Sequence, residues 1–427
     1  MTRQVSRRSL LLAAAAVPSL AWPPELAAWW ESLFGGTPTP SPTPSPDPTE
    51  TPTAIPTEAP ADAGGSLGSY GPDGRHWPAN TPKLGSTFGT VIDVACTWAS
   101  IGKAIASVTD AEIEAGVHIR VAPGTLPGFG ASSGSRGVLK NLGRGTASTN
   151  ILVSPKDGWG TVSIADSSRF VGVKGVTFAR INARFMLLSD CSRTNWVQSK
   201  VSYGFRMTAS NGVVRECNAY EVVMADAKID IADPFGYAAG KNSMIADSVW
   251  EGCYCAPVFR PDGASDHIDS LQMYGNGAYR GLTIRDSTIF GGLNSAIQLG
   301  GPKSRDPELG TPFFTVEHSI LTAQVVAASV RYPAPSGAYV PTMGQAINGS
   351  GESGQLFARD SFVFGSMYTT KWGEVANSFC SYDKAPANNP SLVGGWQYDA
   401  GLSDADAAWF DAQTPIPTDD YLRRIWA

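Results

Sequence analysis

Three six-residue stretches of this chain share one pattern, an Asp-Ser pair followed by three residues and a Gly, at positions 247–252, 286–291 and 360–365. A looser copy begins at His318. Short strand-like units that recur at irregular intervals are typical of stacked repeats, in which each unit buries its apolar face against its neighbours. The pattern predicts a domain of stacked strands, and the loops between the strands are where function usually resides.

Strand-like segments of the same kind recur along much of the chain, and each begins just after a short polar turn. Their starts lie about 17 to 42 residues apart, which is the range of solenoid periods. The three longest intervals follow residue 220, so we expect inserted loops there. The segments are 176–178, 200–203, 217–220, 248–250, 287–290, 319–321 and 361–364.

The start of the folded region carries a helix followed by a strand. Ile101, Ala104, Ile105 and Val108 recur at helical spacing, which predicts a helix over 98–108, and an alternating strand and a Pro-Gly-Thr turn follow at 117–125. This order resembles the opening of right-handed parallel β-helix proteins of the pectate-lyase-like superfamily. The resemblance covers roughly residues 85 to 385 and implies an all-β, single-stranded, right-handed parallel β-helix (a solenoid). In that family an N-terminal helix caps the first, exposed strands.

A β-sandwich is the main alternative fold. It requires antiparallel hairpins with Asn-Gly or Asp-Gly turns at regular spacing. Such pairs occur, but they lie inside a repeat of one strand type, so we favour the β-helix. Near the C-terminus, 403–410 and 418–426 predict two short helices, with Ser403 as the N-cap of the first.

The N-terminus resembles a twin-arginine export signal, because Arg7-Arg8 precedes an apolar run that is too short for a membrane span. A Thr-Pro and Ser-Pro tract follows and predicts a stiff spacer. We therefore expect a secreted or cell-surface protein with no transmembrane span in its mature form. The expected organisation is a signal peptide at 1–21, a short apolar segment at 22–36, a linker at 37–66, a parallel β-helix at 80–385 and a C-terminal cap segment at 386–427.

The net charge and the cysteine spacing limit the expected binding partners, disulfides and metal sites. The net charge is −6 and no basic stripe is present, so nucleic acid is not an expected partner. We also expect a monomer. Export permits disulfides, but Cys253 and Cys255 are too close in sequence for a relaxed bridge, and no Cys/His spacing fits zinc. Cys191 and Cys217 are expected to pack in the core as small apolar side chains.

A column of polar side chains is the main candidate site. If Leu271 and Met273 face the core, Gln272 faces outward. The same alternation places Asp230 and Gln298 outward on the neighbouring repeats, and Arg331 extends the series. Neighbouring strands lie about 4.8 Å apart, so such a column spans one or two units of a polysaccharide lying along it.

His267 and Asp269 stand where the Gln272 strand begins, and two chemistries remain open there. Asp230 and Asp233 lie on the preceding repeat, and paired carboxylates serve as acid and base in glycoside hydrolysis. A lyase instead needs a base and a cation that neutralises a uronate carboxylate. Base and clamp candidates are Lys228, His267, Lys303, Arg305 and Arg331, and carboxylates for a calcium ion are Asp230, Asp233, Asp266 and Asp269.

The motifs of the superfamily are only partly present. Asp266-His267 resembles the Asp-His of the pectate lyase signature, but Ala264-Ser265 stands where Trp-Ile is expected. Arg331-Tyr332-Pro333 resembles the lyase Arg-x-Pro, but Ser336 replaces the second Arg. The resemblance therefore implies a fold more strongly than an activity.

Structural roles compete with functional ones at several positions. Asp247, Asp286 and Asp360 are expected turn formers, and His118 and His318 are expected to be structural. Gln272 and Gln298 fit a ladder that satisfies backbone groups as well as they fit ligand contacts. Tyr274, Tyr237 and Trp372 are candidates for stacking on sugar rings, although core packing explains them nearly as well.

The sequence therefore leads to two functional hypotheses. The first is a secreted carbohydrate-active enzyme, a lyase or a hydrolase, with His267, Asp269, Asp230 and Arg331 as catalytic candidates. Its predicted substrate-binding residues are Gln272, Gln298, Lys228, Lys303 and Tyr274, and its predicted calcium ligands are Asp233 and Asp266. The alternative is a non-catalytic surface protein that binds glycan with the same face, while the export signal disfavours a phage tailspike.

Overall fold

The chain folds mainly as parallel β-strands. A computed structural model describes residues 69–128, 138–230, 232–299, 314–341, 344–349, 356–368, 372–382 and 394–427, which all belong to one compact unit. The predicted signal peptide, the apolar segment and the predicted linker at 37–66 lie outside the described residues, as do Lys303 and Arg305.

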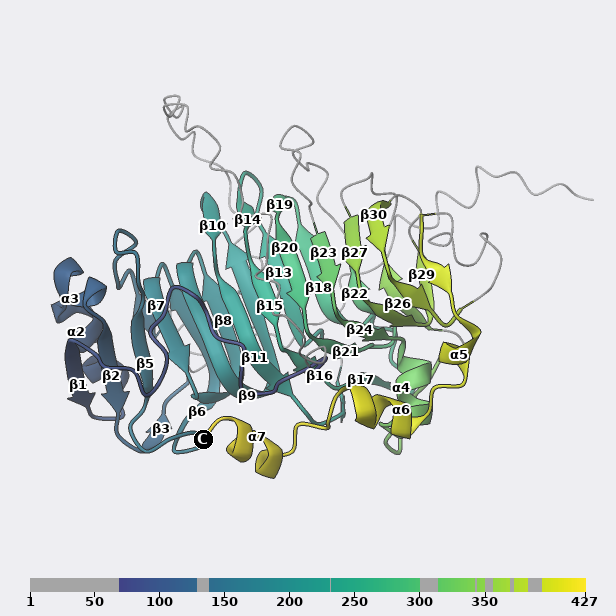
Figure 1. Cartoon of the computed structure of the whole chain (residues 1–427), viewed down its shortest axis with the longest axis horizontal. Helices are drawn as coiled ribbons and strands as arrows, with labels where there is room; N and C mark the ends of the chain where they lie inside the picture. The colour runs from purple at the N-terminus through teal and green to yellow at the C-terminus, as the bar shows by residue number, and fades with distance from the viewer. Residues whose placement is uncertain are drawn as a thin grey trace, which may run out of the picture. The chain divides into compact units, whose positions relative to one another are not determined.

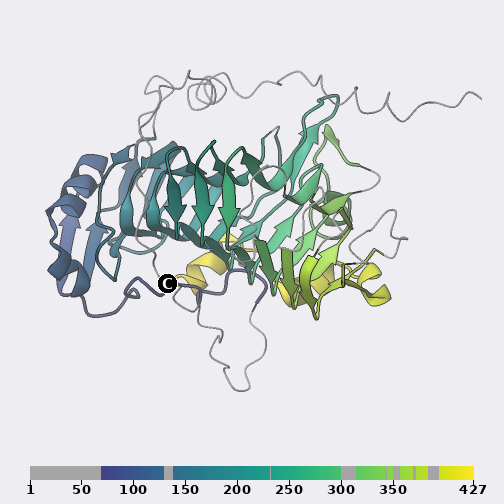
Figure 2. The same ribbon diagram turned by 90° about the horizontal axis from the view of Figure 1, so that it is seen from above.

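Twenty-six of the described strands join into one sheet, which contains two parallel ladders that share β9. Figures 1 and 2 show their strands side by side from two directions. In order of pairing, the first ladder consists of β1 (Thr90–Val94), β2 (Val117–Val121), β5 (Ile151–Pro155), β7 (Lys174–Ala179), β9 (Ser192–Ala209), β11 (Asn218–Met224), β15 (Val249–Glu251), β20 (Leu282–Arg285), β23 (Phe314–Glu317), β27 (Leu356–Arg359) and β30 (Trp372–Ala376). From β11 it also continues through β16 (Tyr254–Cys255), β21 (Thr288–Phe290), β24 (Ile320–Thr322), β28 (Phe362–Phe364), β31 (Phe379–Cys380) and β32 (Gln397–Tyr398).

The second ladder consists of β3 (Gly124–Leu126), β6 (Val162–Val171), β8 (Asn182–Ser189), β9, β13 (Phe235–Ala239), β18 (Asp269–Gly275), β22 (Ser295–Gln298), β26 (Gln345–Asn348) and β29 (Ser366–Tyr368), with β4 (Leu139–Lys140) beside β6. Two three-stranded sheets complete the set: β10 (Val213–Arg215), β14 (Met244–Ala246) and β19 (Ala278–Arg280), and β12 (Lys228–Ile229), β17 (Val258–Pro261) and β25 (Ala338–Tyr339). Across the described ranges only β17 and β25 pair antiparallel. The parallel pairing of the other described strands excludes the β-sandwich and is compatible with a solenoid.

Helices lie near both ends of the described chain, and one lies between β24 and β25. They are α2 (Trp98–Ser107), α3 (Asp110–Glu114), α4 (Gln324–Val330), α5 (Ala400–Ser403), α6 (Ala407–Gln413) and α7 (Asp419–Ile425). The helix predicted over 98–108 is confirmed as α2, which buries Ile101 and Ile105 in the same core as β1 and β2. The prediction that Ser403 caps a helix is wrong: Ser403 ends α5, and Asp406 caps α6 by accepting the Trp409 N–H at 3.0 Å.

The interior between the ladders is apolar. Aromatic rings contact one another along it: Phe170 lies tilted against Phe178 with centroids 4.5 Å apart, and Phe178 stacks on Trp196 at 5.9 Å. Cys191 and Cys217 are buried in this core, as predicted, and all six cysteines are free thiols. No helix within the described ranges is long and apolar enough to cross a membrane.

One corner of the fold is built from residues in the left-handed backbone region, with φ between 40° and 64°. The residues just before them pair in continuous register from Ala179 in β7 to Ala376 in β30. Only Gly adopts this region readily, and Asn, Asp and His tolerate it better than most residues. We call these residues the corner column: Arg180, Gln198, Glu221, Gly252, Asp286, His318, Asp360 and Asn377.

The corner column shows that the three Asp-Ser stretches at 247–252, 286–291 and 360–365 do not occupy equivalent positions in the fold. Asp286, His318 and Asp360 belong to it and are turn formers, as predicted. Asp247 is also left-handed, but it follows β14 in a separate three-stranded sheet, at a different corner. Gly252, the last residue of that repeat, takes the equivalent position instead. The Asp-Ser pairs therefore do not all mark one register.

A ladder of hydroxyl groups follows the corner column. Ser287, Ser319, Ser361 and Ser378 each donate to the carbonyl oxygen two residues earlier, at 2.6 to 2.8 Å. Each hydroxyl also accepts the N–H of the equivalent residue on the preceding strand, from Cys253 onward, at 3.0 to 3.3 Å. The Ser of the repeat thus satisfies buried backbone groups, which explains its recurrence.

Candidate functional site

A polar column runs across the second ladder, as the sequence predicted for Gln272 and Gln298. The two glutamines are register partners on β18 and β22 and are half-buried, whereas Leu271, Met273 and Ile297 are fully buried. The register continues to Gly236 and Arg206 on one side and to Asn348 on the other. We call this series the outer column; its described members are Arg206, Gly236, Gln272, Gln298 and Asn348.

The expectation that Asp230 joins this column is wrong, because Gly236 is the register partner of Gln272. Asp230 instead follows β12, which pairs with β17 in a separate sheet. Its carboxylate lies 3.6 Å from Lys228 Nζ and accepts a hydrogen bond from the Tyr203 hydroxyl at 3.4 Å. The apolar-polar alternation misled here because Ile229 is exposed rather than inward-facing.

Asp233 and Asp269 form a buried carboxyl pair at the start of β18. Asp233 accepts the backbone N–H of Asp269 at 2.8 Å. Asp269 is only 1% exposed, and its Oδ1 accepts hydrogen bonds from Ser295 Oγ at 2.5 Å and Asn294 Nδ2 at 2.9 Å. Burial and the neighbouring Asp233 charge raise the pKa of Asp269 to about 7, and burial raises the pKa of Asp233. The pair can therefore hold a proton near neutral pH.

Arg206 connects this pair to the outer column. It donates to the Tyr274 hydroxyl at 3.3 Å and to the backbone carbonyl of Asp233. Gly236 stands between the strands of Arg206 and Tyr274, and a Cβ there would lie 2.9 Å from the Gln272 carbonyl oxygen. The glycine thus permits the close approach of these groups. Arg206 was missed, although Phe205-Arg206-Met207 has the same alternation as the Gln272 strand.

The other predicted residues near the pair have separate surroundings. His267 is exposed, and its charge acts on the Asp233 carboxyl. The backbone carbonyl of Asp266 accepts a hydrogen bond from Arg260 at 3.4 Å. Lys228 lies 3.8 Å from the centroid of the Tyr203 ring, and burial lowers the pKa of its amino group.

Arg331 does not extend the outer column, which corrects the sequence prediction. The segment interpreted as a strand is the end of α4, and Arg331 is its C-cap. Its guanidinium donates to the Tyr254 hydroxyl at 3.1 Å and pairs with Asp411 of α6 at 2.6 Å. Arg331 therefore fastens a C-terminal helix to the domain.

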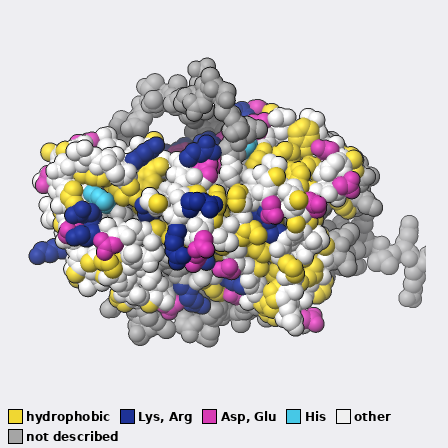
Figure 3. Space-filling model, turned by 60° about the horizontal axis from the view of Figure 1, so that its bottom comes forward, with side chains coloured by type: hydrophobic (Ala, Val, Ile, Leu, Met, Phe, Trp, Pro, Cys, Tyr) yellow, Lys and Arg dark blue, Asp and Glu magenta, His cyan; other side chains and the backbone are white. Residues whose placement is uncertain are grey.

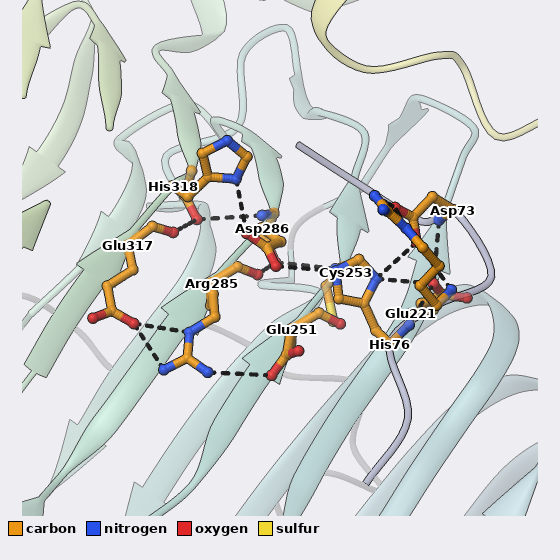
Figure 4. A network of polar contacts seen from close by, with 12 residues as sticks. Asp73, His76, Glu221, Glu251, Cys253, Arg285, Asp286, Glu317 and His318 are labelled. Carbon is orange, nitrogen blue, oxygen red and sulfur yellow. Dashed lines mark hydrogen bonds and ion pairs between the residues drawn. The ribbon is translucent and has the colours of Figure 1, made fainter. Parts of the chain in front are cut away.

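Two groups of possible metal ligands occur among the described residues, and both contain His76. They are Asp73, His76 and Glu221, and His76, Glu251 and Asp286. The predicted calcium ligands Asp233 and Asp266 belong to neither group. Figure 4 shows the network around His76, whose ring lies between Glu221 and Asp286. Sequence reasoning missed it because His76 is separated from these partners by 145 and 210 positions.

Burial and hydrogen bonding act in opposite directions on this network. Burial lowers the pKa of His76, but hydrogen bonds to Asp286 and Glu221 outweigh it and raise the pKa to about 10. Burial likewise favours the neutral form of Asp286, yet hydrogen bonds from His318 and His76 leave its pKa below the ordinary value.

A surface hollow of about 380 Å³ lies over β2 and β5, and His118, Arg120, Ser154, Lys156 and Arg180 contribute to its lining. The His118 ring nitrogen lies 2.8 Å from Ser154 Oγ, and burial lowers the pKa of His118 to about 4. None of the predicted site residues lines this hollow. On the face seen in Figure 3, basic and acidic side chains are interspersed.

Comparison with known proteins assigns no family to this arrangement. No protein-family model matches the chain, and no curated protein or solved structure does.

Proposed function

We propose that the two ladders wind into a right-handed parallel β-helix of the pectate-lyase-like type, with α2 as its N-terminal cap. The chain passes repeatedly between the ladders, for example from β16 in the first to β18 in the second and back to β20. This alternation is what a coil of strands requires, and parallel pairing between successive turns accompanies it.

We further propose that the protein is a secreted glycoside hydrolase that acts on an extracellular polysaccharide along the outer column. The observation that carries this proposal is the Asp233–Asp269 carboxyl pair beside the column. Glycoside hydrolysis needs one carboxyl group that is protonated near neutral pH and a second carboxylate nearby. In this proposal Asp233, at 9% exposed and with a pKa raised by burial, is the acid that protonates the leaving oxygen, and Asp269, at 1% exposed, is its paired carboxyl group.

Hydrolysis fits these residues better than β-elimination does. Elimination needs a basic side chain free to take a proton beside a carboxylate. Arg331 is engaged with Asp411 under α6, and Lys228 is engaged with Tyr203 and Asp230. His267 is the remaining described candidate base, and calcium binding by Asp233 and Asp266 remains a prediction. The lyase reading is therefore the weaker of the two.

The test is incubation of the purified protein with a panel of neutral and acidic polysaccharides, with and without a chelator. New reducing ends without absorbance near 235 nm (roughly, the unsaturated uronate product) indicate hydrolysis. Asp233→Asn and Asp269→Asn should abolish product formation. Asp230→Asn is the matched control, because Asp230 is a half-buried carboxylate outside the pair. Equal loss in all three variants, or a product absorbing near 235 nm, contradicts the hydrolase proposal.

The second candidate is glycan binding without catalysis, and the near-complete burial of Asp269 favours it. In that case the outer column holds a polysaccharide while the carboxyl pair only shapes the start of β18. Binding across the panel with no product from any member, unaffected by Asp269→Asn, would support this candidate over the hydrolase.

A further inference from the structure

The corner column has a gap at Gly252, and a side chain from the N-terminal segment fills it. A Cβ on Gly252 would collide with the His76 ring. His76 thus lies in the column between Glu221 and Asp286, and His318 follows, hydrogen-bonded to Asp286 at 2.7 Å (Figure 4). Carboxylate and imidazole groups therefore alternate along this corner.

Glu221 fixes the orientation of the His76 ring. Its Oε1 lies 2.9 Å from His76 Nδ1 and also accepts the backbone N–H groups of Asp73 at 3.1 Å and Gly74 at 2.8 Å. Its Oε2 accepts the indole N–H of Trp426. Glu221 is fully buried and saturated with donors, so it suits an outer partner of the imidazole better than a metal ligand.

The other ring nitrogen contacts Asp286, and Glu251 lies close to both residues; the Asp286 carboxylate accepts fewer hydrogen bonds than Glu221 does. His76 Nε2 lies 3.1 Å from Asp286 Oδ2, and the ligand atoms of His76, Glu251 and Asp286 all lie within 4.8 Å of one another. Glu251 pairs with Arg285 at 3.6 Å, which is beyond hydrogen-bonding distance. The hydrogen bonds that hold His76 go to Glu221 and Asp286, so they do not explain the position of Glu251.

We propose that His76 Nε2, Glu251 and Asp286 form a binding site for a divalent first-row transition metal ion such as Zn²⁺ or Mn²⁺. One imidazole nitrogen and two carboxylate oxygens are suitable ligands for these ions. A ligating His commonly donates its other N–H to a carboxylate, and ligating carboxylates are themselves hydrogen-bonded. Glu221 and His318 supply these two outer contacts.

The charge and the separation of His76 and Asp286 are compatible with this assignment, and Glu251 lies within 4.8 Å of both. Ligand atoms of a tetrahedral zinc site lie roughly 3.3 Å apart when each bond is about 2.0 Å, which is close to the separation of His76 Nε2 and Asp286 Oδ2. With an imidazolium, the three ligands carry a charge of −1. Exchange of its proton for a dication makes the group neutral. The metal would tie the N-terminal segment to the ends of β15 and β20.

The test is metal binding by the full chain after chelator treatment and removal of the chelator. Thermal unfolding is followed with and without Zn²⁺, Mn²⁺ or Ca²⁺, and isothermal titration gives the affinity. Two matched variants are compared: Glu251→Gln removes a proposed ligand, and Glu317→Gln removes the other carboxylate paired with Arg285. Both substitutions preserve side-chain size, and neither touches the hydrogen bonds of His76.

We expect Zn²⁺ or Mn²⁺ to raise the Tm of the wild-type chain and of Glu317→Gln by a few degrees, on the order expected when the ion is well above its Kd. In Glu251→Gln the affinity should fall by about tenfold or more. The site is refuted if neither ion shifts the wild-type Tm, if only Ca²⁺ does, or if Glu251→Gln binds as tightly as Glu317→Gln. Any of these results would leave His76 as an imidazolium that only clasps the N-terminal segment.

Discussion

Replacement of Asp269 by Asn should stabilise the protein, and increasingly so as the pH rises. The pKa of Asp269 is raised from 3.8 to about 7, so between these values the folded state holds a proton that the unfolded state releases. Stability contributed by this group is therefore complete below pH 4 and lost as the pH rises to 7. Asn keeps the carbonyl oxygen that accepts from Ser295 and Asn294, but carries no charge.

The magnitude follows from the pKa difference. Each pKa unit corresponds to about 1.4 kcal/mol, so the raised pKa of Asp269 lowers the stability of the fold by roughly 4 kcal/mol above pH 7, and by roughly 2 kcal/mol at pH 5, where folding must take up a proton. Because Asp269 is almost completely buried, solvent screening reduces this little. The stability gained by Asp269→Asn should thus be larger at pH 8 than at pH 5, by about 2–3 kcal/mol.

The assay is chemical unfolding of both proteins at pH 5 and pH 8, followed by circular dichroism. Asp230→Asn serves as the control, since it removes a carboxylate outside the pair. If Asp269→Asn is less stable than wild type at pH 8, or gains the same amount at both pH values, the reasoning about the carboxyl pair is wrong. Loss of hydrolysis together with higher stability would separate the proposed role of Asp269 in catalysis from its role in folding.

Three further outcomes are expected. Gly236→Ala should weaken the proposed polysaccharide binding and lower stability by about 1–3 kcal/mol, measured by titration and denaturation, because the new Cβ meets the Gln272 carbonyl. Arg331→Met should lower the unfolding free energy by about 1–3 kcal/mol yet leave turnover unchanged, and lost turnover would return Arg331 to the site. A thiol reagent should modify only Cys96 in the folded protein and all six cysteines in denaturant, since the other five are buried.

Local sequence patterns predicted the side-chain directions within single strands, because these depend only on neighbouring residues. The alternation around Gln272 and Gln298 identified the outward positions on two strands, because side-chain direction within a strand has a period of two. The same rule failed at Asp230, where the pattern resembles a strand but Ile229 is exposed. Periodicity gives no information about which sheet a segment joins.

The sequence patterns did not predict which residues far apart in the chain come together in the fold. The corner column accepts Arg, Gln, Glu, Gly, Asp, His and Asn, so its members share a backbone conformation rather than a residue type. Gly252 therefore could not be recognised as the equivalent of Asp286. The position of His76 depends on how the N-terminal segment crosses the strands, and no local pattern encodes that path.

The hydroxyl ladder beside the corner column has a direction, so truncation at its two ends removes different hydrogen bonds. Each Ser accepts the N–H of the strand before it, so the acceptor for every strand is supplied by the one that follows. Removal of the last strands leaves the Ser361 N–H buried without its acceptor, which costs about 1–3 kcal/mol. Removal from the other end instead leaves the Phe362 N–H without the Ser319 carbonyl oxygen that accepts it, and leaves one acceptor position of the Ser361 hydroxyl unused. During synthesis, therefore, each strand of the ladder is completed only when the next has emerged.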